Sequence, residues 1–587
     1  MTPTLPQDAT DGPARRAALD AARARYRYSY TYPPGAAWAD EVPKGEGYSI
    51  PYVADYLKIE ATLKANHVAA DLGGLEEFSE QQHREEREGF SPEHLRHELF
   101  SLGQSIAARM RRTRFESVED FRRFFGILEE PALMSAFLGL DAAQDELFAW
   151  QRLAGANPMM LEGLDARPER MPVTEAHFAA ALGAMAEGDS LEAALAEGRL
   201  FVADYRHMDG LPSGKSGDAP KYLYAPIALF ARPKRGAAAL LPVAIQCGQE
   251  PGDAFPIWTP RDGARWRMAR TIVQISDGND HETRQHLGKA HAVMEAVILA
   301  AMRNLPPPHP LYALLTPHFE TTLQINDSAK NSLIAPGGGV DHVLGGTLET
   351  SVTLTALGLG EFRLDEGAPP TQLAKRRVAD TGALPVFPYR DDALDVWGAI
   401  TKFVGGYVEL YYPDDAAVAA DTELAAFLAE LGGEDGGRLR GVPVARGRAQ
   451  LAELLSVMIW TASAQHSALN YAQFPYMGMI PNLPGAGYAP APTAATPDEE
   501  RSLVDLLPPV DVATEHFTLA YQLSNIRRNF LGDYPLLHWK HRPAKALADA
   551  FAKHLKDLEL LIGARDGGRL LSYPFLRPSL IAASIHI

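Results

Sequence analysis

The chain has 587 residues, of which 46% are hydrophobic and 22% are charged, and its formal net charge is −18. This composition is typical of a soluble globular protein, and the negative charge argues against nucleic acid as a partner. The single cysteine, Cys247, excludes an intrachain disulfide framework and a cysteine-based zinc site. We expect Cys247 to be a small buried residue.

The beginning of the chain predicts a tail without regular structure. Residues 1–25 contain no apolar signal region, so we expect a disordered tail on a cytoplasmic protein. No 18 apolar residues follow one another, which predicts that no helix crosses a membrane. The chain shows no fixed-period repeat and no strong linker after residue 50, and we expect residues 26–587 to form one large domain. The alanine- and arginine-rich composition fits a bacterial source.

The residue pattern predicts a mainly α fold with one small β region. Residues 51–200 read mostly as helices, including one that is capped at Ser91. Residues 199–248 contain short β-branched or aromatic runs between Gly, Pro and Lys, and these predict strands and hairpins. Further helices are predicted in the stretches 264–335, 394–432 and 447–474.

Three histidines follow one another at a constant spacing in HETRQHLGKAH, where His281, His286 and His291 are each five residues apart. On an ideal α-helix, residues i and i+5 lie about 140° apart and do not share a face. A π-type turn, with about 4.4 residues per turn, would nearly align them. Because the sequence is strongly apolar beyond His291, the helix should be buried. We interpret the stretch as a metal site in a widened helix; the alternative for each histidine is a hydrogen-bonded core residue.

Two later features offer further metal ligands. His466 and Asn470 lie four residues apart on an apolar helix and could present an imidazole and an amide oxygen to one point, although a polar core pair fits equally well. The chain ends at Ile587 on an apolar run, which suggests that its α-carboxylate is buried and must be paired or bound to metal. Three imidazoles, an amide and a carboxylate would suit redox-active iron better than zinc.

Together, HETRQHLGKAH, SAQHSALNYAQ and the terminal Ile587 resemble the lipoxygenase family. That family has a His-x4-His-x4-His run in a widened core helix and a second helix with S-A-x-H-x-x-x-N-x-x-Q. The resemblance covers roughly residues 150–587 and is weaker upstream. It implies that 26–587 form a lipoxygenase-like catalytic domain without the N-terminal β-barrel of many eukaryotic members. The implied cofactor is one non-heme iron per chain, held by His286, His291, His466, Asn470 and the carboxylate of Ile587; manganese stays an alternative.

The resemblance also implies roles for residues around the metal ligands. His281 would support the site without binding the metal. Gln473 aligns with a glutamine that links the metal site to the substrate pocket. Glu282 stands where the family often has glutamine, so this hydrogen-bond network is expected to differ.

A substrate pocket is implied by residues of three further segments. Ala329 occupies a position where alanine accompanies S hydroperoxides and glycine accompanies R, so we expect S products. Leu333 and Leu523 align with leucines that clamp the substrate at its reactive carbon. The implied pocket floor consists of Val343, Leu344 and Gly278. The positions of carboxylate-binding arginines in some members are taken here by Asp327, Ser328 and Leu483.

The implied activity is dioxygenation of polyunsaturated fatty acids by bis-allylic hydrogen abstraction, which gives S-configured hydroperoxides. The implied partners are a polyunsaturated fatty acid, O2 and a transiently contacted membrane surface. One alternative within the family is a hydroperoxide isomerase that forms epoxyalcohols. Another is a catalytically silent lipid-binding protein, which the intact ligand positions disfavour.

Overall fold

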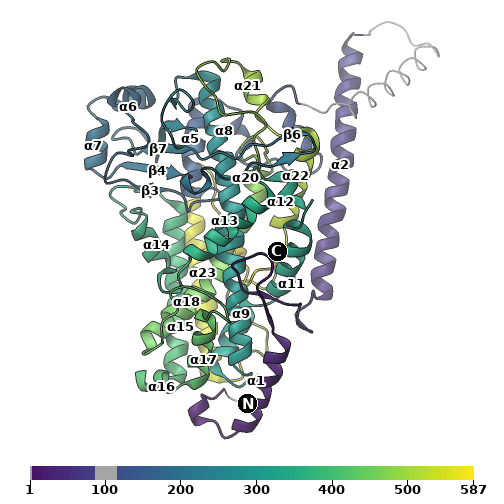
Figure 1. Ribbon diagram of the computed structural model, residues 1–587, viewed down its shortest axis with the longest axis vertical. Helices are drawn as coiled ribbons and strands as arrows, with labels where there is room; N and C mark the ends of the chain where they lie inside the picture. Colours follow the sequence, from purple (N-terminus) through teal and green to yellow (C-terminus); the bar gives the residue numbers. More distant parts are fainter. Residues whose placement is uncertain (1–2, 86–114, 140) are drawn as a thin grey trace, which may run out of the picture.

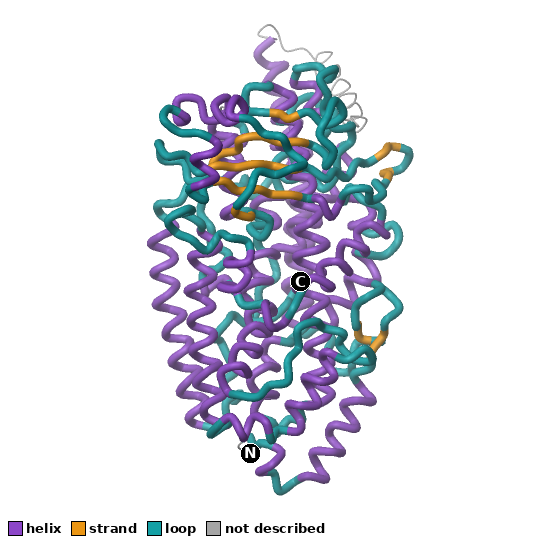
Figure 2. Tube along the Cα trace, turned by 60° about the vertical axis from the view of Figure 1, so that its left-hand side comes forward, coloured by secondary structure: helices purple, strands orange, loops and turns teal. Residues whose placement is uncertain are grey.

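The computed structural model describes residues 3–85, 115–139 and 141–587 and is mainly helical, as predicted. The longer strands gather at one end of the molecule, and helices make up most of the rest (Figures 1 and 2). The helix predicted from Ser91 lies outside the described residues. Among the residues that the structure describes, no helix combines the length and apolar character needed to span a bilayer.

A five-stranded antiparallel sheet confirms the β region predicted over 199–248. Its order is β3-β4-β7-β8-β9, and α5 and α6 pack against β8. The central strands are almost wholly buried, which explains their continuous apolar sequences. Cys247, directly after β8, is buried as expected. The strands are β3 (Glu162–Gly163), β4 (Leu200–Asp204), β7 (Ile227–Ala231), β8 (Leu241–Gln246) and β9 (Ile257–Trp258), and two small sheets pair β1 (Tyr28–Ser29) with β2 (Trp38–Ala39) and β5 (Lys215–Ser216) with β6 (Ala219–Pro220).

Two core helices contain π-helical segments. The first runs through α8 (Gly263–Asn279), η5 (Asp280–Ala292) and α9 (Val293–Asn304), and η5 is a π-helix of 13 residues. The second runs through α18 (Arg448–Trp460), the π-helical η9 (Thr461–Gln465) and α19 (His466–Asn470). The widened helix predicted from the histidine spacing is therefore confirmed.

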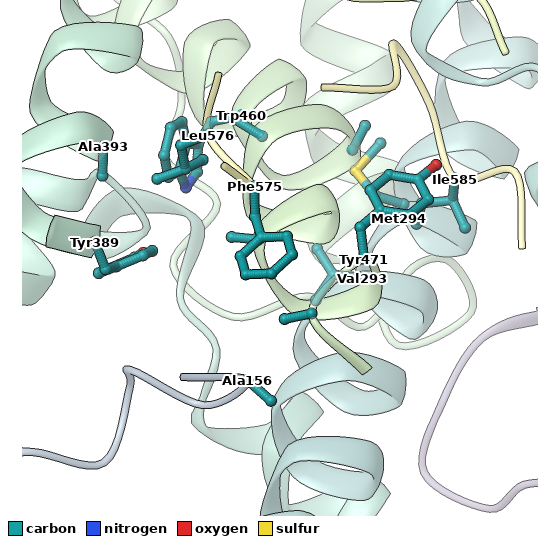
Figure 3. Packing of buried hydrophobic residues seen from close by; sticks show 14 of the residues in the cluster. Ala156, Val293, Met294, Tyr389, Ala393, Trp460, Tyr471, Phe575, Leu576 and Ile585 are labelled. Atoms are coloured by element: carbon teal, nitrogen blue, oxygen red, sulfur yellow. The ribbon is translucent and has the colours of Figure 1, made fainter. Parts of the chain in front are cut away.

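The hydrophobic core surrounds these two helices. Figure 3 shows part of it, in which side chains of α9, α18 and the C-terminal segment belong to one buried cluster. Further helices around the core are α4 (Met134–Phe137), α5 (Asp141–Ala154), α6 (Glu175–Leu182), α7 (Leu191–Ala196), α10 (Pro310–Leu315), α11 (Thr322–Ser328), the π-helical η7 (Ala329–Leu333), α12 (Gly339–Val343), α13 (Leu348–Glu361), α14 (Pro369–Lys375), α20 (Gln473–Met477), α21 (Glu500–Val504), α22 (Val510–Ser524) and α23 (Arg542–Asp566).

The helix predicted over 394–432 is divided into three. α15 (Pro388–Tyr411) ends before Pro413, and α16 (Asp415–Ala419) and α17 (Thr422–Gly432) follow. Asp414 and Asp421 cap the two later helices, because their carboxylates accept hydrogen bonds from Ala417 N–H at 2.8 Å and Leu424 N–H at 2.9 Å. A proline and two aspartate caps therefore interrupt an apolar pattern that reads as continuous.

The expectation of a disordered tail over 1–25 is wrong for the described residues 3–25. Helix α1 (Gly12–Arg25) packs against α9 and buries Arg15 and Leu19. Arg15 Nε donates to Glu423 Oε1 at 2.9 Å, in α17. A partner 408 residues away makes this arginine-rich segment part of the domain, and the local sequence does not reveal it.

Helix α2 (Ile50–Glu85) is a long helix at the outside of the molecule (Figure 1). It contacts α22, and Asp55 pairs with Arg528, which lies beyond the C-terminal end of α22. Three apolar side chains on its first turns remain exposed, with fractions of 88% for Ile50, 44% for Val53 and 61% for Leu57. Such an apolar face can contact a lipid surface or another apolar body.

Candidate metal centre and adjoining cavity

The π-helix η5 brings His286 and His291 together. Their Nε2 atoms lie 3.1 Å apart and both side chains are buried. Within the same π-helix, Asp280 accepts hydrogen bonds from Arg284 Nε at 2.5 Å and Gln285 Nε2 at 3.0 Å. Side chains at i, i+4 and i+5 thus meet at one carboxylate, which a widened turn permits.

The neighbouring helix α13 approaches η5 very closely. A Cβ atom at Gly288 would lie 2.7 Å from the carbonyl oxygen of Thr355 in α13. A Cβ atom at Gly358 would lie 2.9 Å from the carbonyl carbon of Arg284. The two glycines therefore let the backbones of α13 and η5 touch, and this contact supports the widened segment from one side.

His466 completes a cluster of three imidazoles. The possible ligand atoms of His286, His291 and His466 all lie within 4.8 Å of one another. Neither nitrogen of the fully buried His466 has a hydrogen-bond partner among the described residues. Buried polar atoms are rarely left without a partner, and a metal ion in the cluster would satisfy them.

The electrostatics of the cluster favour neutral imidazoles. Burial, with the neighbouring His286, lowers the pKa of His291 to about 3. Burial also lowers the pKa of His466 well below its usual value, and His286 and His291 act in the same direction. Neutral imidazole keeps a nitrogen lone pair free, which is the form that binds metal ions.

His281 lies beside the cluster but outside it. Its Nε2 is 3.1 Å from the Leu469 carbonyl oxygen, and its Nδ1 is 3.1 Å from Glu282 Oε1. The other carboxylate oxygen, Glu282 Oε2, lies 3.6 Å from His286 Nδ1. Both nitrogens of His281 are therefore engaged with protein groups, and Glu282 links it to His286.

Asn470 lies on the same short helix as His466, four residues further on, and the backbone of Ile587 acts on the pKa of His466. Asn470 Nδ2 donates to the Leu523 carbonyl oxygen at 2.8 Å, and its Oδ1 accepts from Gln473 Nε2 at 3.0 Å. These bonds set the orientation of a fully buried amide. Ile587 is 8% exposed and lines the same cavity as His286 and His291. The structure thus places Asn470 on the same helix as His466, and Ile587 in the wall of the cavity that His286 and His291 also line.

A hydrogen-bonded relay behind His291 was missed by the sequence analysis. His291 Nδ1 donates to Asn326 Oδ1 at 2.7 Å, and Asn326 Nδ2 donates to Glu295 Oε2 at 2.6 Å. The backbone N–H of Ala39 donates to Glu295 Oε1 at 2.5 Å. Burial raises the pKa of Glu295 to about 7. The one available signal was an acidic residue within the apolar run VMEAVILAA.

A cavity of about 400 Å³ opens beside the imidazole cluster. Tyr48, Tyr52 and Tyr56, from α2 and the segment before it, form one wall. Other lining residues are His286, His291, Ser328, Ala329, Leu333, Leu523 and Ile587. Among the described residues that line it, none is Lys or Arg.

A smaller cavity of about 50 Å³ adjoins the large one. Five residues line both: Glu282, Leu333, Val340, Leu519 and Leu523. The small cavity is also lined by Gly278, Val343, Leu344, Gln473 and Leu483, which the sequence analysis had named, and by His516, which it had not. The two cavities therefore form a large arm and a small arm that meet at shared side chains.

The helical domain, the buried imidazole cluster and the apolar cavity define a protein that could hold one metal ion beside an apolar ligand. A lipoxygenase family model matches residues 109–571. The chain is 38% identical over 491 residues to linoleate 9/13-lipoxygenase of Pseudomonas aeruginosa. The matched region covers 80% of this chain and 70% of that protein. The chain therefore belongs to the lipoxygenase family, and it is a dioxygenase of that family.

Two other relatives bear on substrate and reaction. The chain is 33% identical over 494 residues to hydroperoxide isomerase ALOXE3 of Rattus norvegicus, covering 83% of this chain and 68% of that protein. The anaerobic crystal structure of a lipoxygenase deletion variant in complex with arachidonate matches with a TM-score of 0.85 and 27% identity. That match covers 100% of this chain and 84% of the other.

Proposed function

We propose that this protein inserts O2 into a polyunsaturated fatty acid of the linoleate or arachidonate type and releases an S-configured hydroperoxide. The observation that carries the proposal is the buried cluster of His286, His291 and His466, which adjoins an apolar cavity of about 400 Å³. The relative that is a linoleate lipoxygenase and the one solved with arachidonate support this substrate class. The net reaction adds one O2 to one C–H bond, so it needs no further reductant.

We propose one non-heme iron per chain, with His286, His291, His466, Asn470 and the carboxylate of Ile587 as its ligands. The unpartnered nitrogens of His466 and the neutral state of the imidazoles support this assignment. Bound iron would supply the one-electron oxidation that starts hydrogen abstraction from a bis-allylic carbon. Ligand identity alone does not decide between iron and the neighbouring divalent metal manganese, so metal analysis of the purified protein must distinguish the two.

The protein's own residues would bind, orient and enclose the fatty acid. Leu333 and Leu523 lie where the two cavity arms meet, so a bis-allylic carbon between them would lie near the metal. Ala329 lines the large arm, where its methyl group would cover one face of the chain. Because no Lys or Arg is among the described lining residues, we propose that the methyl end enters first.

The outer surface supports a transient membrane contact. Ile50, Val53 and Leu57 are exposed on α2, close in sequence to the tyrosines that line the large cavity. A lipid surface could therefore deliver a fatty acid beside the cavity. We further propose that residues 26–587, with α1 packed against them, act as one catalytic domain; the cytoplasmic location stays a prediction.

The test is conjugated-diene absorbance after mixing iron-replete protein with linoleic or arachidonic acid in air. We expect an O2-dependent rise, with one O2 consumed per diene formed and an S product by chiral chromatography. No diene and no O2 uptake with either acid or with a phospholipid would overturn the proposed dioxygenation.

A hydroperoxide isomerase is the second candidate, because ALOXE3 is among the relatives. Supplying a ready-made hydroperoxide under argon separates the two functions. Rapid conversion to epoxyalcohol, combined with little O2 uptake on free fatty acids, would favour the isomerase. A silent lipid-binding protein would convert neither substrate.

A further inference from the structure

The small cavity arm is apolar except for three side chains. Its walls include Gly278, Val343, Leu344 and Leu483, whereas Glu282, Gln473 and His516 contribute polar groups. A purely hydrocarbon ligand would need none of them. The partners of the three groups therefore show whether this arm has spare hydrogen-bonding capacity.

Two of the three polar groups are already engaged. The Glu282 carboxylate lies 3.1 Å from His281 Nδ1 and 3.6 Å from His286 Nδ1. Gln473 Nε2 donates to Asn470 Oδ1 at 3.0 Å. Both side chains thus contact residues of the candidate metal centre, and these contacts account for their presence beside the small arm.

His516 is different, because its imidazole has no protein partner among the described residues. It lies on α22, is 6% exposed, and its Nδ1 is buried without a hydrogen bond. His516 is one of the residues that line the small arm. Because no described residue pairs with this imidazole, a ligand group in the small arm that hydrogen-bonds to the part of the ring lining the arm gains affinity.

The surroundings of His516 select the kind of ligand group. Burial lowers the pKa of His516 to about 4, so the ring is neutral near pH 7 and can donate or accept a hydrogen bond. No Lys or Arg lines the small arm among the described residues, and the Glu282 carboxylate acts on His516 electrostatically. An anionic carboxylate would be repelled here, whereas a neutral hydroxyl would not.

We propose that His516 forms a hydrogen-bonding subsite for a hydroxyl group on the acyl chain, so that the protein accepts hydroxylated polyunsaturated fatty acids as substrates. The hydroxyl occupies the small arm, beyond the point where Leu333 and Leu523 border both cavities. The inference rests on the proposed function for its chemistry. The reactions that supply such substrates are hydroxylations, or dioxygenations followed by reduction of the hydroperoxide.

The test compares three probes on the metal-loaded protein: arachidonic acid and its 5-hydroxy and 15-hydroxy derivatives, which retain bis-allylic carbons. Dissociation constants are measured by calorimetry under argon, and kcat/KM by O2 uptake. His516→Phe removes the hydrogen bond, and His516→Met does so with a flexible side chain in case the phenylalanine variant does not fold. His516→Gln keeps hydrogen-bonding groups. Met477 also lines the small arm, so Met477→Leu is the apolar control.

The quantity compared is the ratio of affinity, and of kcat/KM, for a hydroxy acid to that for arachidonic acid. For at least one hydroxy acid we expect this ratio to be higher in the wild type than in the His516→Phe and His516→Met variants. Loss of one hydrogen bond should change this ratio about threefold to tenfold. His516→Gln should retain most of the preference, and Met477→Leu should retain all of it.

An equal ratio in wild type, His516→Phe and His516→Met for both hydroxy acids would overturn the subsite. An equal loss of affinity and of kcat/KM for all three probes would also overturn it, because such a loss indicates a structural role alone. Failure of the proposed dioxygenation is separate: it abolishes O2 uptake with every probe, while the dissociation constants still test His516.

Discussion

The ring of His291 is held from behind by Asn326, which in turn is held by Glu295. This relay sets which nitrogen of His291 carries the proton, so that Nε2 keeps its lone pair toward His286 and His466. The sequence could not show it, because Asn326 lies 35 residues beyond His291. Hydrogen-bond partners of this kind commonly matter for metal affinity almost as much as the ligands do.

Replacing Asn326 should therefore weaken metal binding. Asn326→Ala leaves Nδ1 of His291 and the buried Glu295 without their partner, and we expect iron affinity to fall about 10- to 100-fold. Competition with a chelator, followed by metal analysis, measures the change. Gln324→Ala, two residues away on α11, is the matched control. Unchanged affinity in Asn326→Ala would contradict the relay.

Ala329 is the residue on which product chirality is expected to depend. It lines the large cavity, and Ala329→Gly removes a methyl group from that wall. We expect the fraction of R hydroperoxide to rise, because O2 gains access to a face that the methyl group covers. Chiral chromatography of the reduced products measures it. Fully S products from an active variant would show that other side chains control the face.

At the scale of elements, the contact between α13 and η5 depends on glycine. Gly358→Ala would press a methyl group against the backbone of Arg284, so we expect α13 to move and unfolding free energy to drop by about 1–3 kcal/mol. The metal content should fall as well, because η5 carries His286 and His291. Gly360→Ala, on the same helix with open space around it, should be neutral or stabilising. Denaturant unfolding of both variants measures the change in unfolding free energy, and metal analysis measures the change in metal content.

Some elements can be predicted from the local sequence pattern alone. The five-residue histidine spacing predicted a widened helix, because only a π-helical period aligns such positions, and η5 is π-helical. The short apolar runs predicted the strands of the sheet. By contrast, α1 is ordered by the distant Glu423, and the division of 394–432 depends on capping by Asp414 and Asp421. Single-sequence periodicity contains neither kind of information.

At the scale of the whole molecule, the end of the chain lies in its middle (Figure 1). Residues 581–587 are all buried. The backbone of Ala582 donates to Ser467 Oγ at 3.1 Å, and His318 Nδ1 donates to the Ala583 carbonyl oxygen at 2.7 Å. Because Ser467 directly follows His466, this hydrogen bond joins the C-terminal segment to the helix that carries the third imidazole.

This arrangement makes the position of Ile587 sensitive to anything added beyond it. A Gly-Ser-Gly extension after Ile587 would replace its carboxylate with a neutral amide and would need space in a closed core. We expect loss of bound iron and of O2 uptake, because the proposed ligand set would lack its only anion. The same extension at the N-terminus is the control and should leave both intact. Full iron content and activity in the C-terminally extended protein would refute Ile587 as a ligand.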